Sequence, residues 1–380
     1  MKVLFVTNNV NIPGNGICSS VNATVKHLKD RGIDARLLAG KAPGTDGPAP
    51  DFPLEKFHFP IFQPIIDANG FSYAKLTGRT MREAIEWADI VHVTEPLFLQ
   101  EKAVNIARKM GKPVVGTFHL YTQNILNEIP GASWEWSNDV LMKMWNNAIF
   151  RHCSIIQCPT SAVKRLLQKH NYRSKLEVIS NGIEIDEQKV IAAKPEKNPY
   201  IILNTGRYAN VKSQKTLLEA MEHSKHSREI KLIFAGTGVN YDKLKKTADN
   251  LLSRGVLAFP PQFGFRTHKE ISGIARQAYL YVHCATLEVE GLGCLEAIKE
   301  GCVPVIGSGD LIGTTDFALD DRSIYPAQDA KALANKIDWW IEHPAQREEA
   351  GQRYADFSRQ FDINRSISAI ISMYEEALGK

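Results

Sequence analysis

The amino-acid sequence predicts an α/β protein with two doubly wound, Rossmann-like domains, each built on a parallel sheet. Strand-like apolar runs alternate with stretches of helical periodicity along almost the whole chain, which is typical of parallel sheets. The alternation stops at residues 192–199 and then starts again. With 380 residues, 44% of them hydrophobic and 23% charged, the composition is globular and the length suits two domains.

The first half of the chain contains six strand-like runs, at residues 2–7, 34–39, 90–94, 113–119, 154–159 and 177–180. Apolar residues recur at helical spacing between these runs, as in Ile17, Val21, Val25 and Leu28, and again in Ala103, Ile106, Ala107 and Met110. Six prolines between residues 42 and 64 predict an irregular excursion from the sheet.

The second half repeats the pattern after the sequence AAKPEKNP, which indicates a linker at residues 192–199. Strands are expected at 201–205, 230–235, 279–284 and 303–306, and the tail from about residue 344 is helical in pattern, with Ile367, Ile370, Met373 and Tyr374 on one face. We therefore expect domains at 1–192 and 199–360, followed by a helix at 361–380. Ligands bind such open sheets at the carboxyl ends of the strands, so we expect a ligand cleft between the halves.

Composition excludes several classes of protein. No window of eighteen consecutive apolar residues predicts a membrane-spanning helix, and the N-terminus reads as a buried strand rather than a secretory signal. The six cysteines include no CxxC pair, which favours reduced thiols in the cytoplasm and no structural zinc. The net charge of +4 is too small to indicate nucleic-acid binding. All of this excess lies in residues 1–190, which hold 22 Lys and Arg against 18 Asp and Glu.

The first strand-to-helix turn, NIPGNGICSS, contains Gly14 and Gly16. Glycine permits close backbone approach, and the N–H groups that open the next helix can bind an anion. A G-x-G without the third glycine is a weak dinucleotide signal. An ordinary turn that needs glycine at positive φ explains the pattern equally well.

Two cations follow the first strand of the second half. Gly206 and Arg207 come directly after that strand, and Lys212 precedes a helix expected from about residue 213. Two cations beside a helix N-terminus suit a diphosphate, although solvated loop cations are the alternative. The next strand ends in AGTG, where Gly236 would let the backbone pass close to a ligand.

The segment LEVEGLGCLEAIKEGCVPVIG has the most specific pattern in the chain. Glu288 and Glu296 are separated by seven residues and enclose Gly291 and Gly293. The spacing predicts Glu288 in a loop and Glu296 one turn into a helix that opens at the glycines. Carboxylates placed in this way accept hydrogen bonds from hydroxyls while backbone N–H groups meet phosphate, which is chemistry for a sugar nucleotide. Acidic capping of a helix is the alternative explanation.

Taken together, these motifs resemble the retaining glycosyltransferase family 4, whose GT-B fold consists of two Rossmann-like domains. The resemblance covers nearly the whole chain and rests on the order of the first GxG, TFH ending at residue 119, GR-x4-K, AGTG, FGF at 263–265, and E-x7-E followed by AIKEGCVPVIG. Within the family, EVEGLGCLE and FHLYTQNIL look closer to bacterial enzymes that glycosylate diacylglycerol or related lipids.

The resemblance implies a role for each matching position. His119 would act near the transferred sugar, Arg207 and Lys212 on the diphosphate. Glu288 would contact the donor sugar and Glu296 the ribose, while the FGFR segment would meet the nucleobase. The implied donor-binding set is Gly14, Gly16, Gly206, Gly236, Phe265, Arg266, Gly291, Leu292, Gly293 and Glu296. The family more often has adjacent glycines in the first turn. A histidine that ends a strand, as His119 does, is also a common structural residue.

The implied activity is transfer of a hexose, with retention, from a nucleotide diphosphate sugar to a lipid or glycan hydroxyl. A UDP-sugar is the favoured donor, and no metal or other cofactor is expected. The acceptor would be a diacylglycerol-type lipid or, alternatively, a glycan of polysaccharide or lipopolysaccharide assembly. The final helix is implied to cross back to the first domain.

A basic stretch in the first half suggests a peripheral membrane contact. Residues 161–175 carry five cations and no acid, and Trp134, Trp136 and Trp145 lie nearby in sequence. Such residues dock proteins on anionic lipid at the inner face of a cell membrane. A solvated helix face with core tryptophans is the alternative.

Two other classes of enzyme also use Rossmann-like domains. A nicotinamide-dependent oxidoreductase predicts a complete GxGxxG after the first strand, and the third glycine is missing here. A sugar-nucleotide epimerase needs acids and histidines placed for proton abstraction, and activity without any acceptor would favour it.

Overall fold

The structure is a computed structural model that describes residues 1–10, 12, 15–40, 49–58, 63, 73–76, 78–126, 135–185 and 198–380. The chain divides into two compact units. Unit 1 consists of Met1–Gly182 together with Asn364–Lys380, and unit 2 consists of Ile183–Ile363. The division falls after Gly182, ahead of the linker expected at 192–199.

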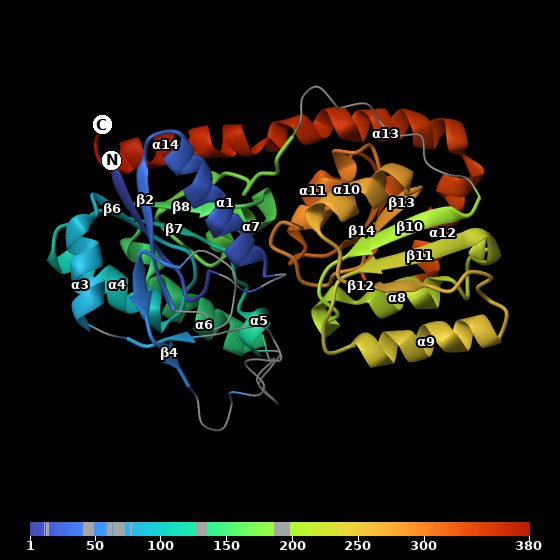
Figure 1. The fold of residues 1–380 in the computed structure, drawn as a ribbon, viewed down its shortest axis with the longest axis horizontal. Coiled ribbons are helices and arrows are strands. Elements are labelled where there is room, and N and C mark those ends of the chain that lie inside the picture. The colour runs from blue at the N-terminus through green and yellow to red at the C-terminus, as the bar shows by residue number, and fades with distance from the viewer. Residues whose placement is uncertain are drawn as a thin grey trace. The chain divides into compact units, whose positions relative to one another are not determined.

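Unit 1 is built on a seven-stranded parallel sheet with the order β3-β2-β1-β6-β7-β8-β9 (Figure 1). Its strands are β1 (Lys2–Val6), β2 (Asp34–Gly40), β3 (Phe52–Leu54), β6 (Ile90–Val93), β7 (Val114–Thr117), β8 (Ile155–Cys158) and β9 (Lys175–Val178). The short strands β4 (Lys56–Phe57) and β5 (Tyr73–Ala74) form a separate antiparallel pair. Every residue of β6, β7 and β8 is buried, as expected for central parallel strands covered on both faces.

The helices of unit 1 are α1 (Gly16–Asp30), α3 (Gly78–Trp87), α4 (Phe98–Lys109), α5 (Gln123–Leu126), α6 (Glu135–Ala148), α7 (Ser161–Lys169) and α14 (Ile363–Ala377). Helix α1 begins where the Asn15 side chain accepts hydrogen bonds from the backbone of Ile17 at 3.0 Å and Cys18 at 3.3 Å. Of its predicted apolar face, Val21, Val25 and Leu28 are buried in the core and Ile17 is half-buried.

The last helix, α14, packs in unit 1 although it follows unit 2 in the chain (Figure 1). The face predicted from its spacing is buried and consists of Ile367, Ile370, Met373 and Tyr374. The Tyr374 hydroxyl lies 2.7 Å from Nδ1 of His92 on β6, and Arg31 donates to Oγ of Ser368 at 2.7 Å. Helix α14 is therefore part of the unit 1 core rather than a loose tail.

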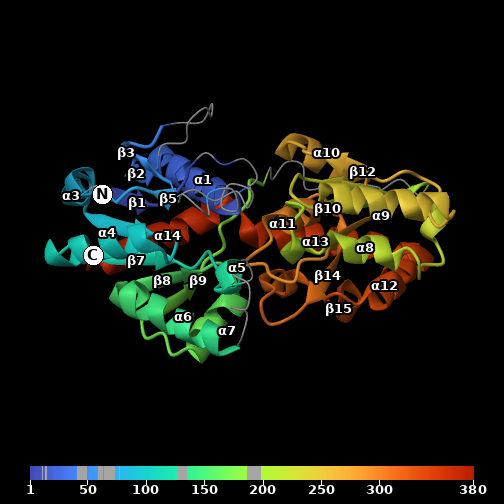
Figure 2. The ribbon, with the colours of Figure 1, turned by 90° about the horizontal axis from the view of Figure 1, so that it is seen from below.

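Unit 2 is built on a six-stranded parallel sheet with the order β12-β11-β10-β13-β14-β15. Its strands are β10 (Tyr200–Thr205), β11 (Ile230–Ala235), β12 (Gln262–Gly264), β13 (Leu280–His283), β14 (Val303–Ser308) and β15 (Ile324–Pro326). Its helices are α8 (Gln214–Ala220), α9 (Tyr241–Ser253), α10 (His268–Gln277), α11 (Leu292–Ile298), α12 (Ala330–Glu342) and α13 (Pro344–Ser358). Helices α8 and α9 pack together on one face of the sheet, and α10 and α11 pack together on the other (Figures 1 and 2).

The structure differs from the sequence-based expectation at the sheet edges and in one loop. Strands β3, β12 and β15 were not expected, because three residues are too few to show a period of two. The expected excursion at 42–64 contains β3 and β4 in its described part. Gly14 and Trp134, both singled out above, lie outside the described residues. All six cysteines are buried thiols.

Candidate functional site

The predicted site residues of unit 2 gather at the carboxyl edge of its sheet. All six strands are parallel, so their carboxyl ends lie at one edge. From β10 the chain adds strands toward one side of the sheet, and from β13 it adds them toward the other side. The neighbouring strands β10 and β13 are therefore the topological switch point, where open α/β sheets bind ligands. Arg207 follows β10 and Glu288 follows β13, one from each side of that point.

Lys212, Glu288 and His283 form a cluster at the switch point. Nζ of Lys212 donates to Oε2 of Glu288, and Nε2 of His283 lies 3.6 Å from the same oxygen. The ion pair is largely shielded from water, since the Lys212 and Glu288 side chains are 21% and 17% exposed. The structure thus brings together two residues that the sequence assigned to separate motifs.

Backbone hydrogen bonds hold the two halves of this cluster in place. Thr286, between β13 and Glu288, donates its N–H to the carbonyl of Val211 at 2.8 Å, next to Lys212. Glu288 forms an isolated parallel bridge with Ile312, donating to Leu311 at 2.9 Å. The side chain of Gln214 donates to the Arg207 carbonyl at 2.8 Å. These hydrogen bonds of the fold therefore hold the cluster in place.

The charges of the cluster favour an ionised Glu288. Burial opposes ionisation, but the neighbouring cations Lys212 and Arg207 outweigh it and hold the pKa of Glu288 below its usual range. Burial lowers the pKa of His283 to about 4, so this imidazole is neutral at pH 7. Its Nε2 lies 3.2 Å from Oγ1 of Thr314 and its Nδ1 lies 3.4 Å from the Tyr281 hydroxyl. His283 thus links Glu288 to the core of the unit.

Packing within unit 2 explains why position 236, in the AGTG loop, is a glycine. A Cβ on Gly236 would lie 2.0 Å from the carbonyl oxygen of Gly206, and Tyr208 donates its N–H to Thr237 at 2.7 Å. The loop after β11 therefore packs backbone to backbone on the loop that carries Arg207. This packing accounts for the motif without a ligand.

The glycines that open α11 are explained in a similar way. Gly291 has φ +80°, and a Cβ there would lie 2.4 Å from Oγ1 of Thr314. A Cβ on Gly293 would lie 2.1 Å from Oγ1 of Thr205. Leu292 is the first residue of this seven-residue helix, so its N–H and that of Gly293 have no acceptor one turn earlier in the helix.

Glu296 is paired with a residue that the sequence analysis missed. Its Oε1 lies 2.7 Å from Nδ1 of His268, the first residue of α10, and this contact raises the pKa of the imidazole. The Glu296 side chain is 18% exposed, so it remains reachable from solvent. Phe265 is exposed after β12, and Arg266 donates to its carbonyl at 2.8 Å. Residues 265, 266 and 296 therefore lie at the same sheet edge as the cluster but outside its direct contacts.

Unit 1 has its own switch point, between β1 and β6. Oε2 of Glu95, just after β6, accepts from the Asn8 backbone at 2.8 Å, from the Asn8 side chain at 3.0 Å and from Gln100 at 2.9 Å. Burial raises the pKa of Glu95, although these hydrogen bonds oppose the shift. Glu95 is not among the residues predicted from the sequence, although an acid directly after a buried strand is a visible signal.

His119 lies two residues beyond β7 at the same edge of unit 1. Its side chain is half-buried, and burial lowers its pKa to about 4, so it is neutral at pH 7. Gly16 is the first residue of α1 and is exposed.

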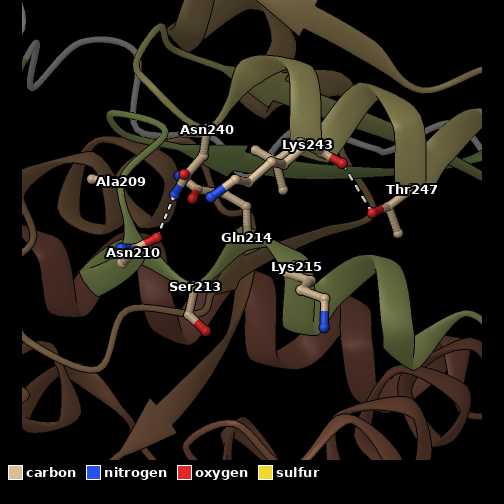
Figure 3. A pocket seen from close by; sticks show the side chains of 9 residues that line it. Ala209, Asn210, Ser213, Gln214, Lys215, Asn240, Lys243 and Thr247 are labelled. Carbon is tan, nitrogen blue, oxygen red and sulfur yellow. Dashed lines mark hydrogen bonds between the residues drawn. The ribbon is translucent and has the colours of Figure 1, made fainter.

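A pocket of about 240 Å³ borders the loop that carries the cations of unit 2 (Figure 3). Figure 3 shows Asn210 and Asn240 joined across it by a hydrogen bond of 2.8 Å, with Lys243 beside them. Neither Lys212 nor Glu288 lines this pocket, so it is separate from the cluster at the switch point.

The described residues contain neither a metal-binding cluster nor a membrane-spanning helix. No group of three or more His, Cys, Asp or Glu side chains in the described part of the chain is arranged to hold a metal ion. Within the same residues, no helix is both long enough and apolar enough to cross a membrane.

Two protein families match adjoining parts of the chain. Glycosyltransferase Family 4 matches residues 14–187, and Glycosyl transferases group 1 matches residues 185–356. Alpha-monoglucosyldiacylglycerol synthase of Streptococcus pneumoniae (strain ATCC BAA-255 / R6) is 24% identical over 265 residues. This match covers 65% of the present chain and 59% of the synthase, which is less than two thirds of that relative's length.

Solved structures with low identity share the whole fold. Sucrose-phosphate synthase from Thermosynechococcus elongatus is 14% identical with a TM-score of 0.74, covering 100% of this chain and 99% of that one. HepE of Anabaena in complex with UDP-glucose is 18% identical with a TM-score of 0.70, covering 99% of this chain and 100% of that one. The predicted architecture of two Rossmann-like parallel-sheet domains is confirmed.

Proposed function

The chain belongs to glycosyltransferase family 4, and from this premise we propose that it is a retaining hexosyltransferase that uses a UDP-sugar. The proposed acceptor is the hydroxyl of a lipid, of the diacylglycerol type. The structure of HepE with UDP-glucose supports the donor class, and the pneumococcal relative, an alpha-monoglucosyldiacylglycerol synthase, supports the lipid.

The observation that carries the proposal is the cluster at the switch point of unit 2. A diphosphate needs fixed cations, and Lys212 and Arg207 lie where ligands bind this class of sheet. An ammonium group has three donors, so Lys212 can keep Glu288 and still bind a phosphate oxygen. Because the ion pair is shielded from water, its charges act more strongly than they would at an open surface.

In the proposed mechanism, these cations stabilise the leaving group. Negative charge grows on the diphosphate as the bond between sugar and phosphate breaks, and preorganised donors lower the energy of that transition state. The acceptor hydroxyl attacks the oxocarbenium-like carbon from the face that the phosphate leaves, and the leaving phosphate oxygen takes the proton. The configuration at the anomeric carbon is thereby retained. We assign the charge stabilisation to Arg207 and Lys212.

The remaining assignments follow from the family. Glu288 would accept from hydroxyls of the donor sugar and Glu296 from those of the ribose, while the N–H groups of Leu292 and Gly293 would meet phosphate. Residues 263–266 would contact the base. His119 would act at the transferred sugar as a neutral hydrogen-bonding group, since burial lowers its pKa to about 4. No metal is assigned a role.

We extend the proposal to the place of the reaction. A lipid acceptor requires contact with a bilayer, and we propose peripheral contact at the cytoplasmic face of the cell membrane. The basic stretch 161–175 supports this, because it has five cations and no acid.

A thermal-shift panel tests the donor. UDP-, GDP- and ADP-sugars are added separately, and the one that binds the native state raises its melting temperature by mass action. We expect UDP-glucose or another UDP-hexose to give the largest shift, and this shift to be lost in Lys212→Ala and kept in Lys215→Ala, an exposed lysine three residues further along. A panel in which no nucleotide sugar raises the melting temperature would contradict the proposal.

Product analysis tests the acceptor and the stereochemistry. Diacylglycerol in mixed micelles is compared with soluble glycans, and the anomeric configuration of the product is determined by NMR. An α-linked product from an α-linked donor is expected with the lipid. Transfer only to glycans would favour polysaccharide or lipopolysaccharide assembly, and conversion of the donor sugar without acceptor would favour an epimerase.

A further inference from the structure

Helix α6 has two apolar faces, and only one of them lies in the core. Met142 and Trp145 are buried at 1% and 6% exposure. Trp136, Val140 and Met144 are 61%, 48% and 58% exposed. These three residues, here called the α6 stripe, are spaced by four, so they lie on one face over about 12 Å at a rise of about 1.5 Å per residue. Three large apolar side chains on successive turns are more than the scattered exposure normal for a soluble protein.

The α6 stripe adjoins the basic stretch 161–175. Oδ1 of Asp139 on α6 lies 3.6 Å from Nδ1 of His170, directly after α7, and the Tyr172 hydroxyl donates to the carbonyl of Met142 at 2.9 Å. Figure 2 shows α6 and α7 next to each other in unit 1. Lys169 and Arg173 are exposed on either side of this junction. Apolar and cationic side chains therefore share one region of the unit 1 surface.

Charge is concentrated in this region. From Glu135 to Lys175 the sequence has seven Lys and Arg against two Asp and Glu, a net charge of +5, whereas the whole chain carries +4. One of the two acids, Asp139, is the residue that faces His170. This segment of the sequence is thus more cationic than the rest of the chain taken together, and its last cation, Lys175, pairs with Glu177 and Glu376.

We propose that the α6 stripe and the adjacent cations of residues 161–175 form the surface that docks on an anionic bilayer. Apolar side chains with a tryptophan enter the boundary between headgroups and acyl chains, and lysine and arginine pair with anionic headgroups at the same level. Long cationic side chains can reach the headgroups while their stems lie on apolar surface. This proposal deepens the proposed function and rests on it for the lipid acceptor.

The test uses the full chain and sedimentation with vesicles, without donor. Vesicles of phosphatidylcholine alone are compared with vesicles of phosphatidylcholine and phosphatidylglycerol. The wild-type chain is expected to bind the anionic vesicles preferentially. Trp136→Gln combined with Val140→Gln and Met144→Gln should weaken this binding at least about tenfold, and Lys169→Glu combined with Arg173→Glu should do the same.

Matched variants control for apolar surface and for charge. Phe98→Gln removes a more exposed aromatic ring from another helix of unit 1, at 69% exposure. Lys246→Glu combined with Lys331→Glu changes the net charge by the same amount as the Lys169 and Arg173 variant, but at exposed positions on helices of unit 2. Both controls should bind vesicles like the wild type. Unchanged binding by the stripe variant, or equal losses in the controls, would overturn the proposal.

Two further measurements separate this proposal from the proposed function. The donor-induced rise in melting temperature should be the same in the stripe variant and the wild type, which also shows that the variant is folded. If the chain binds vesicles but no donor raises its melting temperature, the docking surface is supported and the donor assignment is refuted. A stripe variant that alters only the oligomeric state, measured by light scattering, would make this face a contact between proteins and refute the bilayer.

Discussion

The carboxyl edges of the two sheets can be compared at the point where strand order reverses. In unit 1 this edge holds Glu95, whose carboxylate accepts from the uncharged Asn8 and Gln100, and the pKa of Glu95 is raised. In unit 2 it holds Glu288, whose carboxylate accepts from a lysine, and the pKa of Glu288 is lowered. The same topology therefore holds a carboxylate among uncharged donors in one unit and a carboxylate paired with a lysine in the other. Topology sets where a ligand can bind, and the side chains set which one.

Net charge alone would place the diphosphate site in unit 1 rather than in unit 2. The excess positive charge lies in residues 1–190, yet the cations at a switch point are those of unit 2. A donor diphosphate responds to charges within a few ångströms, because solvent screens more distant ones. The surplus of the first half is instead concentrated from Glu135 to Lys175.

The largest expected effect comes from removing the charge at the unit 2 edge. Lys212→Ala should cost about 2–4 kcal/mol of transition-state stabilisation, a loss of about 30-fold to 1,000-fold in kcat/KM. It also leaves the shielded Glu288 without its main partner. Steady-state kinetics with the donor found in the thermal-shift panel provide the measurement. Lys215→Ala is the control, and near-wild-type turnover in Lys212→Ala would refute the assignment.

The contributions of Glu95 and Glu288 to the free energy of unfolding should depend on pH with opposite sign. The raised pKa of Glu95 means that its contribution to stability is present below its ordinary pKa of about 4.3 and is lost as pH rises through the folded-state value. The lowered pKa of Glu288 means that its contribution is present above that ordinary value and is lost as pH falls. Urea unfolding of Glu95→Gln and Glu288→Gln at several pH values measures both.

The same experiment has a built-in control for packing. Glu95→Ala leaves buried donors of Asn8 and Gln100 unsatisfied, so it should lower the free energy of unfolding by about 1–3 kcal/mol. Glu95→Gln keeps an acceptor oxygen and should lose less. Parallel pH profiles for the two glutamine variants would show that the two edges do not differ as described.

The smallest expected effect tests how Glu288 is held. His283→Ala removes a neighbour of the carboxylate and leaves Thr314 without its ring partner, which should cost about 1 kcal/mol, or about fivefold in kcat/KM. His283→Gln retains a donor and should recover most of the activity. If alanine and glutamine are equally active, His283 does not position Glu288.

The central parts of both sheets could be predicted from sequence, because buried parallel strands are long apolar runs. The edge strands could not, since β3 and β15 have three residues each and contain Pro53 and Pro326. Lys212 and Glu288 were each predicted as site residues. Their direct contact was not, because it depends on the hydrogen bond between Thr286 and Val211 across 75 residues.

Two residue types show where sequence patterns mislead. Gly236 suggested close approach to a ligand, but the carbonyl of Gly206 occupies the space of its missing side chain. Trp136 and Trp145 suggested one surface, but the first is exposed and the second is buried, because nine residues place them on different faces of α6. Helical spacing could have separated them once the bounds of α6 were known.

The position of α14 has a consequence for how the molecule is made. Residues 364–380 complete the core of unit 1, yet a ribosome delivers them after all of unit 2. Until then the sheet of unit 1 lacks the covering side chains of Ile367, Ile370 and Tyr374, and Nδ1 of His92 lacks the Tyr374 hydroxyl. Unit 2 is continuous in sequence, so it can complete its folding before α14 has been synthesised and has packed on unit 1.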